Sequence, residues 1–330
     1  MRLNIYDIAK EAGVSISSVS RVLNNKENIT PEIRAKVEPV LKKYNYKANA
    51  IARGLVKQTM RTVAVLTVDI RVSHYGLTIY AIEQAFSKKG YRVIVCNTIG
   101  DLNKTLEQMK NLLDLHVDGL IFVGSTFVDI CNSKEFKQII GDVKYVVANG
   151  KTTSSQSISI LVDDIKGVSL SVDTLIENGC KNIYYIKDLK TESSLRKLEG
   201  FKKSASIIGC ENNILNCEYG IDGGIEIVEK LLASNTKFDG LIFGEDLTAV
   251  GAIQALNKHQ IKIPENVQVI GYNNSDYSRI SYPTLTSIDN KPDMVGNLCS
   301  KLLIDLLSGE PGGTTLTLDP TLIVRESTKS

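Results

Sequence analysis

Residues 5–24 read IYDIAKEAGVSISSVSRVLN, and the spacing of the apolar side chains in this stretch predicts two short helices around a tight turn. Gly13, between the two apolar patterns, can adopt the positive φ that such a turn often requires. Ser15 is well placed to cap the second helix by accepting a hydrogen bond from its first N–H groups. We expect this helix to run from about Ile16 to Asn24, with its valines facing inward. The side chains that then face outward are those of Ile16, Ser17 and Arg21.

A third helix is expected to begin at Thr30 and Pro31, a capping residue followed by a proline at the first helical position. Its apolar side chains recur at the spacing of one helix face and complete a small three-helix core. They are Ile33, Val37, Leu41 and Tyr44. Pro39 lies inside this span, where it removes a backbone donor and disfavours a regular helix by about 3 kcal/mol. We therefore expect a kink at Pro39 or an earlier end of the helix.

The net charge is distributed unevenly along the chain. Residues 1–60 contain 11 Lys and Arg against 5 Asp and Glu, a formal charge of +6, whereas the remaining 270 residues contain 28 against 32, a charge of −4. A charge run is in most proteins a solvated face. A compact basic unit ahead of a slightly acidic body, however, is typical of a module that binds a polyanion.

Three segments of the N-terminal region resemble the DNA-binding signature of the LacI/GalR family of bacterial transcriptional regulators. They are YDIAKEAGVS at 6–15, VSRVLN at 19–24 and YKANAIARGL at 46–55. The resemblance implies a helix-turn-helix repressor that binds a pseudo-palindromic DNA operator as a homodimer. The residues that would read bases are Ile16, Ser17 and Arg21. The residues that would contact phosphates are Tyr6, Ser15, Ser18 and Asn24.

Residues 49–60 resemble the hinge helix of the same family, which forms on the operator. The resemblance implies that Ala52 and Leu55 contact the minor groove, where an apolar wedge partly unstacks one base step. Gly54 lowers helix propensity by about 1 kcal/mol relative to alanine, which suits a segment that is helical only when DNA and the partner chain are present. The family usually has proline where Ala48 stands. An ordinary interdomain linker is the alternative interpretation.

The rest of the chain shows the pattern of an α/β protein. The apolar run TVAVLTV at 62–68 is followed by a helical stretch at 76–89, by Gly90 and by the apolar run YRVIVC at 91–96. A strand, a helix and a second strand in this order form a βαβ unit, the start of a parallel sheet.

An internal repeat predicts that this core has two lobes. DGLIFVG at 118–124 is echoed by DGLIFG at 239–244, an offset of 121 residues that also carries the strand near Val63 onto IYYI at 183–186. Two doubly wound parallel-sheet lobes place their strand ends at a shared crevice, where ligands bind. This arrangement resembles the periplasmic-binding-protein type I-like core of the LacI/GalR family, preceded here by the small all-α headpiece.

The resemblance also implies the domain boundaries, with crossings between the lobes near residues 160, 290 and 319. The headpiece would span 1–48 and the hinge 49–60. The N-terminal lobe would comprise 61–160 and 291–318, and the C-terminal lobe 161–290 and 319–330.

A small-molecule effector, a sugar or sugar derivative, is implied for the crevice. By position in the family its contacts would be Tyr75, Ser125, Asn149, Lys197, Tyr219, Asp246 and Asn273. Lys197 stands where the family has arginine and Asn273 where it has aspartate, so an unusual sugar, a non-sugar or no ligand are open alternatives. Asp246 has a second interpretation, as the cap of a helix that begins at Leu247. A repressor controlled by a protein partner is a further alternative.

Other functional classes find little support in the sequence. No G-x-G-x-x-G or G-x-S-x-G motif occurs, and the three histidines, His74, His116 and His259, are isolated, so we expect neither an enzyme nor a cofactor. Six cysteines without a C-x-x-C pair argue against a metal site. The chain shows neither a signal peptide nor an apolar run long enough to span a membrane, so we expect a cytoplasmic protein rather than the solute-binding protein of a transporter.

Overall fold

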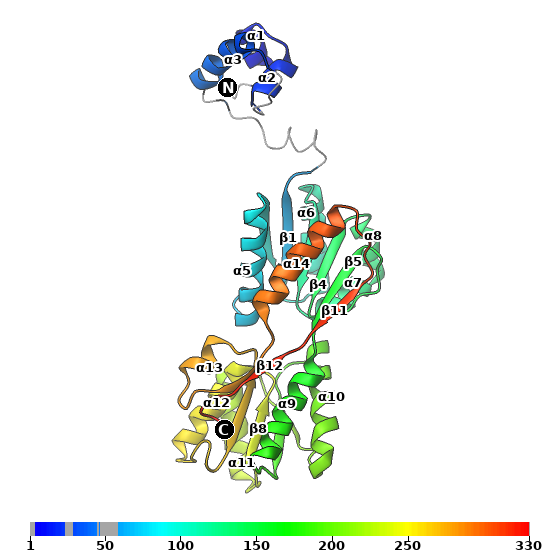
Figure 1. The fold of residues 1–330 in the computed structure, drawn as a ribbon. Helices are drawn as coiled ribbons and strands as arrows, with labels where there is room; N and C mark the ends of the chain where they lie inside the picture. Colours follow the sequence, from blue (N-terminus) through cyan, green and yellow to red (C-terminus); the bar gives the residue numbers. More distant parts are fainter. Residues whose placement is uncertain (1–3, 24–28, 45, 47–58, 330) are drawn as a thin grey trace. The chain divides into compact units, whose positions relative to one another are not determined.

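The computed structural model describes residues 4–23, 29–44, 46 and 59–329. It divides into two compact units, Met1–Arg61 and Thr62–Ser330 (Figure 1). The predicted hinge segment falls mainly outside the described residues.

The first unit contains the three predicted helices: α1 (Ile5–Ala12), α2 (Ile16–Leu23) and α3 (Pro31–Lys43). Its core consists of small and β-branched side chains from all three helices. They are Ile8, Ala9, Ala12, Val19, Val22 and Val37. Gly13 has φ of 63° and ends α1, with its N–H donating to the carbonyl oxygens of Ala9 and Lys10, so the expected turn is confirmed.

Two expectations about α3 are corrected by the structure. The helix continues past Pro39 to Lys43, so the earlier end is wrong. Pro39 and Ala35, whose carbonyl loses its helical hydrogen bond, both lie on the exposed face of α3, where water can satisfy that carbonyl. The side chain of Thr30 makes no capping hydrogen bond, although Thr30 precedes Pro31 at the start of the helix as predicted.

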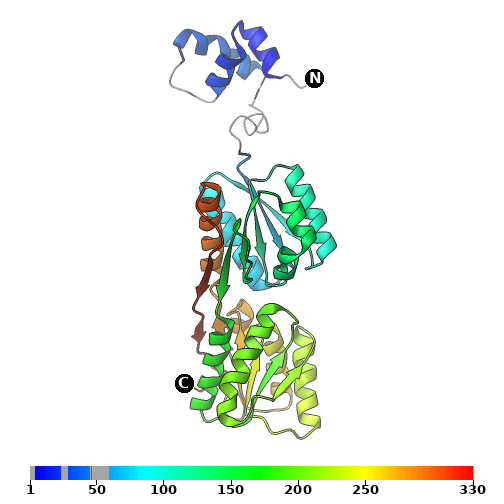
Figure 2. The same cartoon turned by 90° about the vertical axis from the view of Figure 1, so that its right-hand side faces the viewer.

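The second unit contains two six-stranded sheets, each covered by helices on both faces (Figure 2). The N-terminal lobe has the strand order β11-β5-β4-β3-β1-β2, with all neighbours parallel. Its strands are β1 (Thr62–Thr67), β2 (Arg92–Asn97), β3 (Gly119–Val123), β4 (Lys144–Ala148), β5 (Ser157–Val162) and β11 (Thr315–Leu318). Its helices are α5 (Ser73–Lys88), α6 (Leu102–Asp114), α7 (Phe127–Asn132), α8 (Lys134–Ile140) and α14 (Pro292–Leu307).

The C-terminal lobe repeats this architecture with the strand order β12-β10-β9-β8-β6-β7, in which β12 runs antiparallel to β10. Its strands are β6 (Ile183–Lys187), β7 (Ile214–Asn216), β8 (Gly240–Phe243), β9 (Gln268–Tyr272), β10 (Thr286–Asp289) and β12 (Thr321–Ile323). Its helices are α9 (Asp164–Glu177), α10 (Glu192–Ala205), α11 (Ile221–Ala233), α12 (Asp246–Lys258) and α13 (Asp276–Ile280). The two predicted doubly wound lobes are therefore confirmed.

The chain passes between the two sheets three times. It leaves the first sheet after β5, which ends at Val162, returns after β10, which ends at Asp289, and leaves again after β11, which ends at Leu318. Each sheet separates two apolar clusters, one under each layer of helices. The central strands β1, β3, β8 and β9 are buried along their whole length, as is typical of parallel sheets covered on both faces.

Candidate functional site

The outward face of α2 carries the side chains that were predicted to read DNA. Val19 and Val22 are buried, which turns Ser17 and Arg21 to solvent and leaves Ile16 39% exposed. Arg21 forms no ion pair with another described residue. Its guanidinium is therefore free to bind a partner outside the chain.

Hydroxyl groups gather where α2 begins. The Ser15 hydroxyl lies 2.8 Å from that of Ser17 and 2.9 Å from that of Ser18, and it accepts a hydrogen bond from the Ser18 N–H at 3.2 Å. The predicted capping role of Ser15 is confirmed. Tyr6, on α1, is 66% exposed. Asn24, Ala52 and Leu55 lie outside the described residues.

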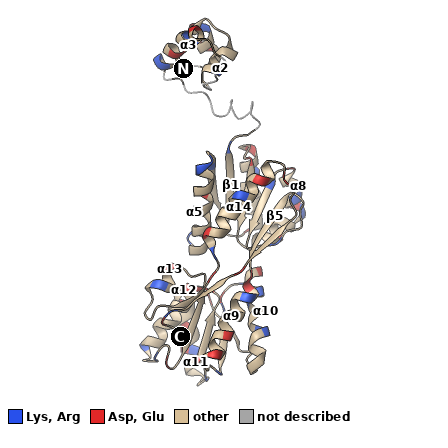
Figure 3. Ribbon diagram, viewed as in Figure 1, with Lys and Arg blue, Asp and Glu red and all other residues tan. Residues whose placement is uncertain are grey.

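Part of the negative charge of the headpiece is neutralised within it. The Glu11 carboxylate on α1 accepts from Lys43 Nζ at 2.7 Å and from the Tyr44 hydroxyl at 3.0 Å. These hydrogen bonds lower the pKa of Glu11 below its ordinary value, and the bond from Lys43 has the larger effect. Figure 3 shows the positions of the basic and acidic residues along the chain.

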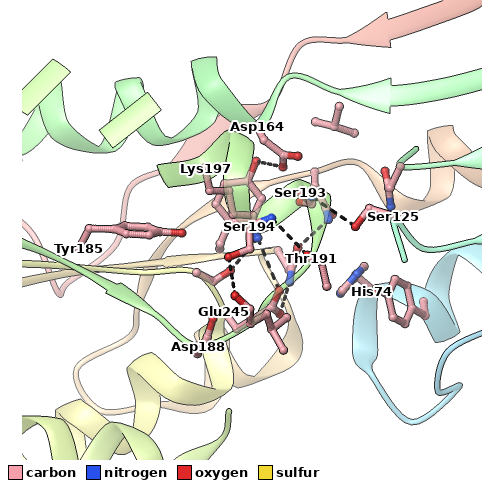
Figure 4. A pocket seen from close by; sticks show the side chains of 18 residues that line it. His74, Ser125, Asp164, Tyr185, Asp188, Thr191, Ser193, Ser194, Lys197 and Glu245 are labelled. Carbon is pink, nitrogen blue, oxygen red and sulfur yellow. Dashed lines mark hydrogen bonds and ion pairs between the residues drawn. The ribbon is translucent and has the colours of Figure 1, made fainter. Parts of the chain in front are cut away.

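A second candidate site is a small cavity between the two lobes of the second unit, here called the interlobe cavity (Figure 4). Its volume is about 30 Å³, room for a water molecule or two. Much of its lining follows the carboxyl ends of strands, as expected for ligand sites in α/β sheets. Ser125 and Asn149 follow β3 and β4 in one lobe, and Glu245 and Asn273 follow β8 and β9 in the other.

Lys197 and Glu245 form a buried ion pair inside this cavity. Lys197 Nζ donates to the Gly244 carbonyl oxygen at 2.8 Å, lies 3.5 Å from the Glu245 carboxylate and stands 3.7 Å above the centre of the Tyr272 ring. Burial raises the pKa of Glu245 to about 8, against the opposing influence of Lys197. Glu245 also accepts a hydrogen bond from the side-chain amide of Asn273.

Asp188 is a further buried carboxylate of the cavity. It accepts a hydrogen bond from the Thr248 hydroxyl at 2.6 Å and forms no ion pair with any described residue. Burial raises its pKa above the ordinary value. His74, on the N-terminal lobe, is buried beside the same cavity, and burial lowers its pKa to about 3, so its imidazole is neutral at physiological pH.

Two hydrogen bonds connect the lobes across the cavity. The Ser193 N–H donates to the Ser125 hydroxyl, and Arg196 Nη2 donates to the Asn149 carbonyl oxygen, both at 3.3 Å. Both distances exceed the usual range for such bonds, so each contributes little to holding the lobes together.

Within the described residues, no group of three or more His, Cys, Asp or Glu side chains could hold a metal ion. No helix in that part of the chain is long and apolar enough to cross a membrane.

Comparison with known proteins identifies the family. Residues 4–49 match the family of bacterial regulatory proteins, lacI family, and residues 172–328 match a periplasmic binding protein-like domain. The chain is 33% identical over 334 residues to an HTH-type transcriptional regulator of Lachnoclostridium phytofermentans, with 99% of both chains covered. The protein belongs to the LacI family.

Solved structures show the same fold. A Lac repressor dimer bound to operator and the anti-inducer ONPF superimposes with a TM-score of 0.86 at 22% identity, with 100% of both chains covered. A LacI family transcriptional regulator from Enterococcus faecium with bound ribose superimposes with a TM-score of 0.71 at 25% identity, covering 81% of this chain and 98% of that one.

In this LacI-family chain, five of the seven residues predicted to contact an effector line the interlobe cavity: Tyr75, Ser125, Asn149, Lys197 and Asn273. Tyr219 and Asp246 line a smaller neighbouring pocket instead. The prediction that Asp246 caps a helix is wrong, because α12 begins at Asp246 itself. Its carboxylate accepts from the Ser275 N–H and hydroxyl and from the Ser287 hydroxyl, at 2.6–2.8 Å.

Glu245, Asp188 and His74 also line the interlobe cavity, although none of them was predicted from the sequence to be a site residue. A signal for Glu245 was present in the internal repeat. When the glycines that follow the two matching strands, Gly124 and Gly244, are aligned, Glu245 falls on Ser125. The sequence held no comparable signal for Asp188.

Proposed function

We propose that this protein is a homodimeric repressor that reads a pseudo-palindromic operator with α2 and is modulated by a small molecule in the interlobe cavity. The observation that carries the proposal is the exposed face of α2, where Ser17 and Arg21 face solvent opposite the buried Val19 and Val22. A helix with this distribution can enter the major groove while its other face stays in the headpiece core.

The side chains of this face suit different parts of the duplex. The Arg21 guanidinium matches the O6 and N7 acceptors of guanine, and Ile16 offers apolar contact to a thymine methyl. The hydroxyls of Ser15 and Ser18, with Tyr6, suit phosphate oxygens, which position the headpiece without reading sequence. Asn24 would add a phosphate contact, and Ala52 and Leu55 would bind the minor groove.

The effector is proposed to be a sugar or sugar derivative. The ribose-bound relative supports this, as does the cavity lined by hydroxyl, amide and carboxylate groups from both lobes. Effector binding would change operator affinity only by the difference between its affinities for the DNA-competent and incompetent arrangements, typically about 1 to 3 kcal/mol. We place the protein in the cytoplasm, with its operator, and assign it no catalytic role.

The base-reading role of α2 is tested with Arg21→Ala. We expect operator affinity to fall by about 1 to 3 kcal/mol, with discrimination relaxed at one base pair in each half-site. The matched control is Arg34→Ala on α3, which removes the same charge from the headpiece. The guanidinium of Arg34 lies 3.2 Å from the Glu38 carboxylate. Fluorescence anisotropy on operator and scrambled duplexes measures both. An equal loss on both duplexes for Arg21→Ala would contradict the role.

A further inference from the structure

Two polar atoms in the interlobe cavity have no hydrogen-bond partner among the residues that the structure describes. The hydroxyl of Tyr185, a side chain that is 0% exposed, and Oδ1 of Asn290, 8% exposed, are both buried and unpaired. Both residues line the cavity, and the Tyr185 hydroxyl points toward Asp188 and Lys197 (Figure 4). An unpaired buried polar atom is unfavourable by about 1 to 3 kcal/mol, so these positions favour a ligand that supplies the missing partners.

The charges that line the cavity are also unbalanced. The Asp164 carboxylate is paired with Arg196 at 2.9 Å, and Glu245 is paired with Lys197 at 3.5 Å. Asp188 accepts a hydrogen bond from the Thr248 hydroxyl and is also attracted by the charge of Lys197, without an ion pair to any described residue. One lysine therefore offsets two buried carboxylates, Asp188 and Glu245, and proteins avoid such an excess of buried charge by pairing it or protonating it.

The cavity already holds an ammonium group. Lys197 Nζ is bound by the face of Tyr272, the Gly244 carbonyl oxygen and the Glu245 carboxylate, which together form a cation site. Asp188 provides a second carboxylate in the lining of the same cavity. An anionic ligand, in contrast, would be placed against two buried carboxylates with one lysine to offset them.

We propose that the interlobe cavity binds a polyhydroxylated ligand that carries a protonated amine, of the amino-sugar class. The amine lies against Asp188 and Glu245, where its positive charge favours the ionised form of both carboxyls, and ring hydroxyls pair with Tyr185 and Asn290. This inference rests on the proposed effector role of the cavity and narrows it to one ligand chemistry. Sugar phosphates and sugar acids are excluded by the same carboxylates.

Ligand entry requires the lobes to separate, because about 30 Å³ cannot hold a sugar ring. The hydrogen bonds that cross the cavity, from Ser193 to Ser125 and from Arg196 to Asn149, are long and easily broken. A bound sugar therefore requires a wider spacing of the lobes than this structure has.

The test is calorimetric titration of the full chain with matched ligand sets: glucose, glucosamine, N-acetylglucosamine and glucose 6-phosphate, with the galactose and mannose counterparts. In at least one set the free amine should bind about tenfold or more tightly than its parent sugar and its N-acetyl form, and the phosphate should not bind. Asp188→Asn should remove the preference for the amine. Asp222→Asn, an exposed carboxylate on α11, is the matched control and should keep it.

Glu245→Gln is a second variant, which should weaken amine binding independently. The inference is overturned if a parent sugar or a phosphate binds more tightly than every amine, or if Asp188→Asn keeps the preference. In that case a bound sugar that changes operator affinity still supports the proposed function. If no ligand of the panel binds, this inference fails, while the DNA-binding role is judged separately by Arg21→Ala.

Discussion

Arg196 donates two hydrogen bonds to a single carboxylate oxygen of Asp164, from Nε at 3.1 Å and from Nη2 at 2.9 Å. The same Nη2 also reaches the Asn149 carbonyl oxygen on the other lobe. Asp164 begins α9 and is 5% exposed, and it accepts a third hydrogen bond from the Tyr272 hydroxyl at 2.9 Å. The guanidinium of Arg196 thus binds Asp164 at the start of α9 in the C-terminal lobe and also contacts the N-terminal lobe.

Replacing Arg196 by alanine should therefore lower the free energy of unfolding of the core. The buried Asp164 would lose a charged hydrogen-bond donor, an effect of about 1.5 to 3 kcal/mol. Arg71→Ala is the matched control, because its ion pair with Asp69 involves an arginine side chain that is 87% exposed and should contribute about 0 to 1 kcal/mol. Urea denaturation followed by circular dichroism measures both. Equal effects of the two variants would contradict the structural role of Arg196.

The stability of the core should fall as the pH rises from about 6.5 to about 8. The pKa of Glu245 is raised from 4.5 to about 8 in the folded chain. Between these pH values, the folded chain keeps a proton on Glu245 that the unfolded chain releases. Its stabilising contribution is complete below pH 4.5 and is lost as the pH rises through 8. The His74 pKa is lowered from 6.5 to about 3, so its opposite effect ends below this window.

Glu245→Gln should flatten this decrease, whose slope cannot exceed about 1.4 kcal/mol per pH unit for one proton. Differential scanning calorimetry of the full chain at several pH values provides the measurement. Glu310→Gln, an exposed carboxylate, should leave the profile unchanged. A wild-type stability that rises between pH 6.5 and 8 would contradict the raised pKa.

The turn between α1 and α2 should depend on the backbone of Gly13. This residue has φ of 63° with nothing within 4 Å of an added Cβ, so substitution introduces strain without a steric clash. Gly13→Ala should destabilise the headpiece by about 1 to 2 kcal/mol, and Gly13→Asn by less, because asparagine tolerates this conformation. Hydrogen exchange of the α1 and α2 amides reports the change. Equal protection in both variants and the wild type would show that the turn is not strained.

The periodicity of the sequence was sufficient to predict the three helices of the headpiece, and the internal repeat was sufficient to predict the two lobes of the core. Apolar spacing placed the three short helices, and the repeat at an offset of 121 residues placed matching strands in the two sheets. Such patterns report which face of an element is buried, and burial is what assembles the layers. The effect of Pro39 on the length of α3 was predicted wrongly, because periodicity does not show that the Ala35 carbonyl, which loses its helical hydrogen bond, faces water.

The chemistry of the cavity was harder to predict, because it depends on side-chain directions where strands end. Glu245 and Asp246 are adjacent, yet Glu245 points into the interlobe cavity while Asp246 is bound by serines from two other segments. The neighbouring side chains of Arg196 and Lys197 also point in different directions. Arg196 pairs with Asp164, whereas Lys197 extends into the interlobe cavity. These choices are made by tertiary contacts that a single sequence does not display.

Operator binding should be strongly salt-dependent. The formal charge of +6 in residues 1–60 of each protomer favours several phosphate contacts, each of which releases condensed counterions. The logarithm of affinity should then fall with the logarithm of salt concentration at a slope of about −0.9 per contact. Anisotropy titrations between 50 and 200 mM salt, roughly the range over which such losses are large, measure it. A slope near zero would contradict the electrostatic role of the headpiece.

The central claim, that the full chain reads a symmetric DNA site, is tested most directly by selecting bound duplexes from a random pool. We expect enrichment of one pseudo-palindrome, with two half-sites related by the two-fold symmetry of a dimer and a guanine whose enrichment disappears with Arg21→Ala. Recovery of a pool without enriched half-sites, or of the same sequences with Arg21→Ala, would contradict it.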